Sequence, residues 1–147
     1  MQRLLLLLLT ACVSASQTRD RPAALELIIA GTTDVAPVLY AARWLYGRML
    51  RAGIRVFEWK GRVLHAKTAV VDGRWATIGS ANLDAQSLRT NLEVNAVFED
   101  EAVAAAAEAM FNQDLYECQQ ITLEQWQERP LGEIILSWLA YRVRAWL

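Results

Sequence analysis

A strand–helix–strand pattern constrains the fold of this 147-residue chain more than any other feature. Residues 25–30 are continuously apolar and end at Gly31, as a buried strand does. Apolar side chains then recur at helical spacing over residues 34–52, and Gly53 stands where a glycine commonly ends a helix. Residues 54–59 are again strand-like. A helix between two strands indicates a sheet with helices packed on it.

The chain continues this alternation as far as residue 117. Three more strands are predicted, over residues 63–71, 75–78 and 92–98. Asp72-Gly73 is a tight hairpin signal, and Asp100 is expected to cap an alanine-rich helix that ends near Glu117. The predicted fold class is therefore α/β, with a mixed β-sheet flanked by helices.

The polar residues before the first helix are expected to supply its N-cap. Thr32, Thr33 and Asp34 carry suitable side-chain oxygens, and Pro37 is tolerated in a first turn. Residues 10–21 are small and polar, which predicts a loop.

Two interpretations of residues 1–24 stay open. The segment Leu9-Thr10-Ala11-Cys12 resembles a bacterial lipoprotein cleavage site, with Cys12 as the lipidated residue. The preceding run of six leucines is shorter than the ~7–15 apolar residues of a signal peptide. This favours a buried helix whose upstream half is missing from the chain.

Residues 121–147 form a tryptophan-rich tail, and from Leu131 onward its apolar side chains follow a helical stripe. One interpretation is a helix packed on the domain's own sheet. The other is an interfacial helix that lies on lipid, with tryptophan at the headgroup level and Arg142 and Arg144 snorkelling. No run approaches the ~18 apolar residues of a transmembrane helix.

Charge and cysteine content exclude several classes of function. The net charge is −1 and there is no basic tail, so binding of nucleic acid through bulk charge is disfavoured. Cys12 and Cys118 show no metal-ligand spacing and no disulfide framework. The length allows one domain at most.

The candidate site centres on His65, the only histidine of the chain. His65 and Lys67 are two residues apart on a predicted strand, so both project from one face. The return strand of the hairpin brings Ser80 and Asn82 back toward their level. An imidazole, an ammonium, a hydroxyl and a carboxamide are thus expected in one small volume.

This set of groups suits phosphodiester chemistry. A neutral imidazole at His65 can attack phosphorus, while Lys67 and Asn82 donate to the non-bridging oxygens. Glu93, on the next predicted strand, can accept a hydrogen bond from the other imidazole nitrogen and hold the ring. Asp72 lies at the hairpin turn, which favours a structural role for its carboxylate.

The segment VLHAKTAVVDGRWATIGSANLDAQSL resembles the HKD motif of the phospholipase D superfamily. Over roughly residues 25–147 the chain resembles the second half of bacterial cardiolipin synthases, with a phospholipase D-like domain at residues 25–120. The resemblance implies the family's fold and a phosphatidyl-transfer or phosphodiesterase chemistry with no metal and no other cofactor. The residues to which it gives roles are His65 (nucleophile or general acid), Lys67 and Asn82 (phosphate binding), Ser80 (support), Glu93 (orientation of His65) and Asp72 (third member of the motif).

Such synthases resemble two copies of this half, whose histidines meet in one active site, whereas this chain has one motif. Three explanations follow. The chain is a fragment or degenerate remnant, or half of a hetero-complex, or a two-fold homodimer that pairs His65 with His65 of its mate.

The leading functional prediction is a cardiolipin-synthase-like phosphatidyltransferase that acts on a phosphatidylglycerol-like phospholipid. It is expected at the bacterial cell membrane as a peripheral protein, with lipid anchoring through Cys12 as the alternative. A homodimeric phosphodiesterase or endonuclease with a single motif is the second possibility, which the near-zero charge and the tail disfavour. The third is a catalytically inactive, membrane-associated remnant.

Overall fold

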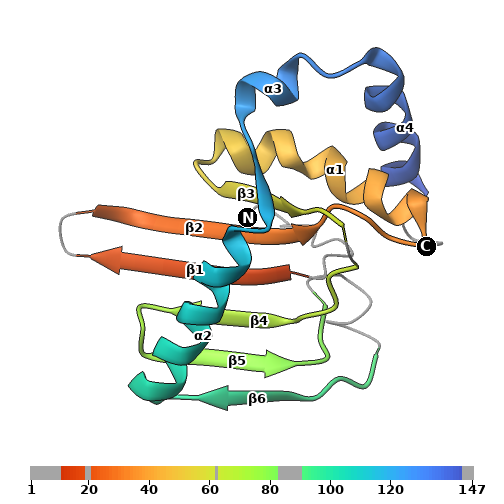
Figure 1. Cartoon of the computed structure of the whole chain (residues 1–147). Helices are drawn as coiled ribbons and strands as arrows, with labels where there is room; N and C mark the ends of the chain where they lie inside the picture. Colours follow the sequence, from red (N-terminus) through yellow and green to blue (C-terminus); the bar gives the residue numbers. More distant parts are fainter. Residues whose placement is uncertain (1–10, 19–20, 62, 83–90, 144–147) are drawn as a thin grey trace, which may run out of the picture.

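A computed structural model describes residues 11–18, 21–61, 63–82 and 91–143, which form a mixed sheet with helices on both faces (Figure 1). Within these residues the seven strands are β1 (Ala11–Thr18), β2 (Arg21–Ala30), β3 (Arg55–Trp59), β4 (Thr68–Val71), β5 (Trp75–Gly79), β6 (Asn95–Phe98) and β7 (Cys118–Ile121). The helices described are α1 (Ala36–Arg51), α2 (Glu101–Leu115), α3 (Leu123–Gln127) and α4 (Leu131–Arg142). The prediction of an α/β fold with a mixed sheet is confirmed.

The strand order is β6-β5-β4-β1-β2-β3-β7. The β1–β4 and β2–β3 pairs are parallel, and the other neighbouring strands are antiparallel. As a result, β2, β3 and β5 end at the same edge of the sheet at which β1, β4, β6 and β7 begin. This edge carries the candidate site and is called the site edge below.

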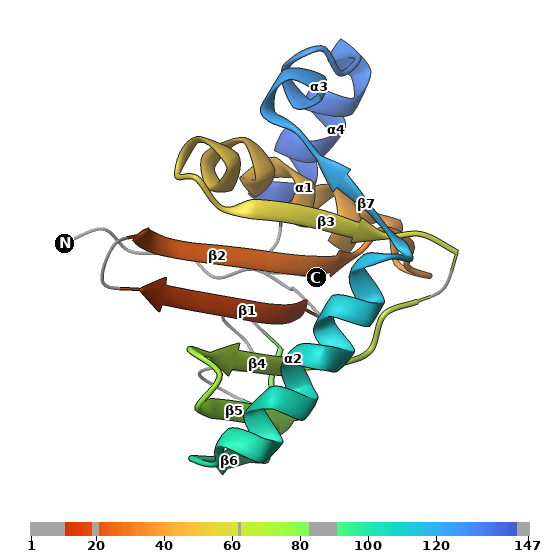
Figure 2. The same cartoon turned by 60° about the vertical axis from the view of Figure 1, so that its left-hand side comes forward.

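Helix α2 lies on one face of the sheet, and α1 lies on the other (Figure 2). On the α2 face, Phe111 packs with Ile28 and Phe57, while Ala104 packs with Val70 and Ala76. Helix α2 therefore reaches from the β2–β3 pair to the β4–β5 pair and holds both halves of the sheet.

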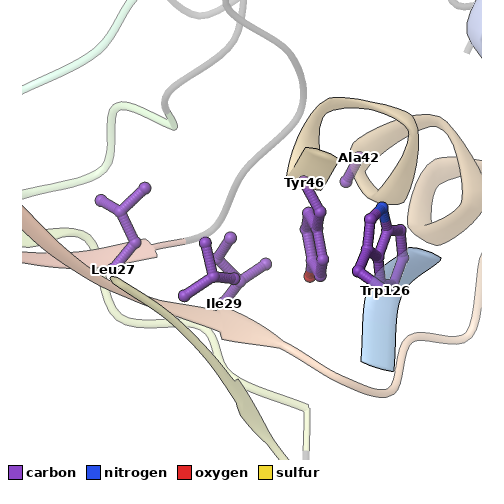
Figure 3. Packing of buried hydrophobic residues seen from close by; sticks show 6 residues of the cluster. Leu27, Ile29, Ala42, Tyr46 and Trp126 are labelled. Carbon is purple, nitrogen blue, oxygen red and sulfur yellow. The ribbon is translucent and has the colours of Figure 1, made fainter. Parts of the chain in front are cut away.

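The core on the other face lies under α1. Tyr46 of α1 is fully buried and its ring stands 4.9 Å from that of Trp126, centroid to centroid. Figure 3 shows both rings beside Ile29 of β2, with Ala42 above them. Trp126 thus fastens the short helix α3 to the core, where burial of so large a side chain contributes most.

A buried ion pair ties α1 to the sheet and to the tail. Glu58 is 2% exposed and accepts two hydrogen bonds from the Arg43 guanidinium, each 3.0 Å long. The same guanidinium donates to Glu133 of α4 at 3.4 Å. Burial, and then the nearby Glu58 carboxylate, raise the pKa of the Tyr46 hydroxyl well above its ordinary value. A paired charge is tolerated here because both carboxylate oxygens are satisfied.

Several local predictions are confirmed. Helix α1 lies where it was expected, with Pro37 in its first turn and Gly53 in the left-handed region (φ 80°) just beyond it. Asp72 and Gly73 both have positive φ (52° and 61°), as the predicted tight turn requires. The carboxylate of Asp100 caps α2 by accepting from two backbone amides, at 2.8 and 3.0 Å.

The predicted loop over residues 10–21 is wrong. Residues 11–18 form β1, a central strand that pairs with β2 on one side and β4 on the other. Its small and polar side chains do not resemble a buried strand, but two long-range ladders override that weak local preference. Residues 4–9 lie outside the described part of the chain, so both interpretations of the N-terminal leucines stay predictions.

Other boundaries also differ from the prediction. The N-cap of α1 is Val35, which makes no side-chain cap bond; Thr33 accepts from the Val35 amide at 3.2 Å instead. Strands β4 and β6 begin only at Thr68 and Asn95, several residues later than predicted. Strand β7 was not predicted.

The tail is helical, as predicted, but α4 packs on α1 and not on the sheet. Ala140 is buried against Ala41, and the rings of Tyr141 and Trp44 lie 6.2 Å apart. No helix within the described residues is long and apolar enough to cross a bilayer.

Candidate functional site

The motif residues gather where β4, β5 and β6 meet the site edge. Two backbone hydrogen bonds extend the ladders past the strand ends: the Gly79 amide donates to the Lys67 carbonyl at 3.1 Å, and the Ser80 amide donates to the Val94 carbonyl at 3.0 Å. The segments that carry Lys67, Ser80 and Glu93 therefore lie side by side. The predicted approach of Ser80 to the level of Lys67 is thus seen in the backbone, whereas a shared volume for the side chains of His65, Lys67, Ser80 and Asn82 stays a prediction.

His65 and Lys67 precede β4, on a segment that belongs to no strand. Leu64 and Ala66 pack toward Phe111 on the α2 face. If side chains alternate along this segment as they do along a strand, His65 and Lys67 project away from Phe111. The shared face of His65 and Lys67 stays a prediction.

The two motif residues also touch directly. The Lys67 ammonium donates to the backbone carbonyl of His65 at 2.9 Å, while the His65 side chain is exposed. Partial burial lowers the pKa of Lys67, and the Glu93 carboxylate acts in the opposite direction. The ammonium is thus held at the His65 backbone, with Glu93 near enough to influence its pKa.

Ser80 positions Glu93. Its hydroxyl donates to Glu93 Oε2 at 2.5 Å and accepts from the Val94 amide at 3.0 Å, and Asn91 donates to Glu93 Oε1 at 3.4 Å. None of the hydrogen bonds among the described residues joins Glu93 to His65. Orientation of the imidazole by Glu93 therefore stays a prediction, whereas the contact between Ser80 and Glu93 gives the serine a specific partner.

Gly79 lets β5 and β6 approach closely at this point. A Cβ atom there would lie 1.8 Å from Asn95 Oδ1 and 2.5 Å from the Val94 carbonyl oxygen. Asn95 Oδ1 in turn accepts from the Ala81 amide at 3.3 Å and so shapes the turn that leads to Asn82, which is half-buried at the same edge.

Asn95 was missed by sequence reasoning. Its signal is the β5–β6 register, which sets it opposite Gly79, and that register is visible only once the strands are paired.

Asp72 is not brought to the other site residues. It lies in the turn beyond β4, where its amide donates to the Ala15 carbonyl at 2.9 Å. At ~3.3 Å per residue, the extended chain from His65 to Asp72 spans roughly 20 Å. This placement favours the structural role over the catalytic one that the motif implies.

The arrangement can bind an oxyanion and present a nucleophile to it. Lys67 supplies positive charge, and the exposed His65 imidazole stands next to it in the chain. Among the described residues no cluster of three histidine, cysteine, aspartate or glutamate side chains could hold a metal ion.

The sequence matches known proteins over most of its length. A family model described as "Cardiolipin synthase, PLD-like domain" matches residues 11–115 and thus includes β1. The chain is 36% identical to cardiolipin synthase B of Escherichia coli K12 over 126 residues, which is 80% of this chain and 29% of that protein.

Two further relatives agree. Cardiolipin synthase A of Proteus mirabilis is 33% identical over 116 residues, covering 79% of this chain and 24% of that protein. The major cardiolipin synthase ClsA of Bacillus subtilis is 37% identical over 106 residues, covering 72% of this chain and 22% of that protein. The chain spans about a quarter of the length of these curated relatives.

Proposed function

Because this chain belongs to the family of cardiolipin synthase PLD-like domains, we propose that it is one half of a phosphatidyltransferase acting on phospholipid phosphodiesters. The observation that carries this proposal is the ladder that holds Lys67 and the Ser80–Glu93 pair next to an exposed His65. We place its action at a membrane surface, as a peripheral protein, because a phosphatidylglycerol-like substrate resides there.

In the first step, a ring nitrogen of His65 attacks phosphorus and the bond from phosphorus to the leaving alkoxide breaks. The alkoxide takes a proton from a general acid, and a phosphohistidine remains. In the second step, the hydroxyl of an acceptor attacks phosphorus, loses its proton to a base and releases His65. Lys67 and Asn82 donate to the non-bridging oxygens in both transition states.

The acid and base of these steps must come from a second half. His65 is the only histidine, and it is occupied as the nucleophile. A second copy of the chain, or a separate chain with its own motif, would supply the other imidazole. A two-fold axis through the site would pair identical residues, which makes a homodimer the simpler arrangement.

The test is to incubate the purified 147-residue chain with phosphatidylglycerol vesicles and to measure cardiolipin, phosphatidic acid and glycerol, alongside its mass in solution. His65→Ala should abolish turnover, and Lys67→Ala should reduce it by roughly 10²-fold or more. The matched control is Lys60→Ala, which removes the only other lysine. Lys60 also lies at the site edge, but it contacts Gln119 of β7, at the opposite end of the strand order from β4, β5 and β6. Turnover by this variant should equal that of the wild type.

Full activity of His65→Ala would refute the assignment. A strict monomer that forms none of the three products would exclude an active homodimer and leave a separate second half or an inactive remnant. Cleavage of DNA without any lipid product would instead favour the single-motif nuclease.

A further inference from the structure

Helix α4 has an apolar face that no described part of the chain covers. Its inner face is packed on α1, where Ser137 and Ala140 are buried. Its outer face carries a continuous set of large apolar side chains, each between 45% and 76% exposed: Leu131, Ile135, Leu136, Trp138, Leu139 and Val143. Most helices that pack on a globular core show polar residues there.

We propose that this outer face of α4 docks the protein onto an anionic lipid bilayer. The inference rests on the proposed function, since a lipid substrate requires a lipid surface within reach of the site. Tryptophan and aliphatic side chains with a long basic residue among them are the composition of a helix that lies in a bilayer interface.

The charges of α4 fit such a surface. Arg142 lies four residues after Trp138 and seven after Ile135, so it projects from the same outer face. Glu133, the only acidic residue of α4, is on the inner side and accepts from Arg43. The outer face therefore presents apolar groups and a positive charge, with no carboxylate.

An anionic bilayer would repel the α2 side of the molecule. Residues 99–117, which include α2, contain six acidic residues and no basic one. Because α1 and α2 cover opposite faces of the sheet (Figure 2), and α4 lies on α1, the acidic side points away from a bilayer bound at α4. Charge complementarity thus selects one orientation.

Docking through α4 also brings lipid to the correct end of the molecule. Helix α1 starts just after β2 ends at the site edge, and the last turn of α4 packs on the first half of α1 through Ala140 and Ala41. In Figure 1 the end of α4 and the tip of β5 both lie toward the right-hand end of the molecule.

The test is co-sedimentation of the whole chain with vesicles of phosphatidylglycerol or of phosphatidylcholine, at low and high salt. The wild type should bind the anionic vesicles more tightly, and salt should weaken the difference. Ile135→Glu/Leu139→Glu should weaken binding to phosphatidylglycerol vesicles by about 30-fold, because two aliphatic side chains no longer leave water. Arg142→Glu should weaken binding to the anionic vesicles alone.

The matched control is Met110→Glu/Tyr116→Glu, which changes two large apolar residues on the α2 side that are even more exposed, and it should leave vesicle binding unchanged. If the α4 double variant does not fold, Leu131→Glu tests the same face at a first-turn position where a carboxylate is compatible with the helix. Circular dichroism establishes that each variant is folded.

Equal vesicle binding by wild type and a folded α4 variant would overturn the proposal. So would an α4 variant that changes only the mass in solution, because that result would assign the face to a second copy of the chain. His65→Ala should bind vesicles like the wild type. An inactive chain that binds through α4 refutes the proposed activity alone, whereas a chain that turns over detergent-dispersed lipid without binding vesicles refutes the docking alone.

Discussion

Gly79→Ala is the single-methyl change that should disturb this site most. The added Cβ would lie 1.8 Å from Asn95 Oδ1, 2.6 Å from Asn95 Cγ and 2.5 Å from the Val94 carbonyl oxygen. The side chain of Asn95 can rotate away, but the carbonyl belongs to the backbone that receives the Ser80 amide. Strands β5 and β6 must therefore separate locally.

The magnitude follows from two costs. Overpacking against groups that cannot move costs about 1–3 kcal/mol, and loss of the hydrogen bond from Ser80 to Val94 adds about 1 kcal/mol. The expected loss is about 3 kcal/mol in the free energy of unfolding, or about 10 °C in Tm for a domain of this size. Urea unfolding followed by circular dichroism measures it directly.

The chain offers a matched control in Gly132, where a Cβ would meet no atom within 4 Å. Gly132→Ala, within α4, should stabilise the protein by about 0.5–1 kcal/mol. Gly79→Ala combined with Asn95→Ala should recover only part of the loss, since the contact with the Val94 carbonyl remains. If the free energy of unfolding of Gly79→Ala lies within 0.5 kcal/mol of the wild-type value, β5 and β6 do not approach as closely as described.

Three other changes test separate parts of the structure. Glu58→Gln should lower the free energy of unfolding by about 2 kcal/mol, measured by urea titration, because the Arg43 guanidinium loses its buried charged partner and keeps only the longer contact with Glu133. Burial lowers the pKa of Lys67, so its charge costs stability at neutral pH; that cost should vanish as pH rises from the folded pKa to the ordinary value of 10.5. NMR titration of the lysine signals shows the shift, with Lys60→Arg for assignment, and an ordinary Lys67 pKa would contradict it. Asp72→Asn should keep both activity and stability, because asparagine tolerates positive φ; a large loss of turnover would restore the catalytic role.

The elements that could be predicted from the sequence are those whose signals are local. The turn at Asp72-Gly73, the cap at Asp100 and the stop at Gly53 each depend on one or two residues and their own backbone angles. The proximity of the segments that carry Lys67 and Ser80 could also be predicted, because a tight turn fixes the register of the strands that it joins.

The parts that could not be predicted depend on contacts between distant segments. Strand β1 has no pattern of its own and exists because β2 and β4 flank it. Strand β7, only four residues long, exists as a partner of the β3 edge. Asn95 became part of the site only through its position opposite Gly79, and the packing of α4 on α1 depends on a contact between Ala41 and Ala140, 99 residues apart in the chain.

The central position of β1 has a consequence for how the protein folds. Strands β4, β5 and β6 form a local meander, but the sheet becomes continuous only when residues 12–15 pair with residues 68–71. Pairing β1 with β4 closes a loop of more than 50 residues. The chain must lose the conformational entropy of that loop before the hydrogen bonds between the two strands can stabilise the fold. The meander that carries the site is therefore the late-joining unit, and amide hydrogen exchange between β1 and β4 should follow global unfolding and not local fraying.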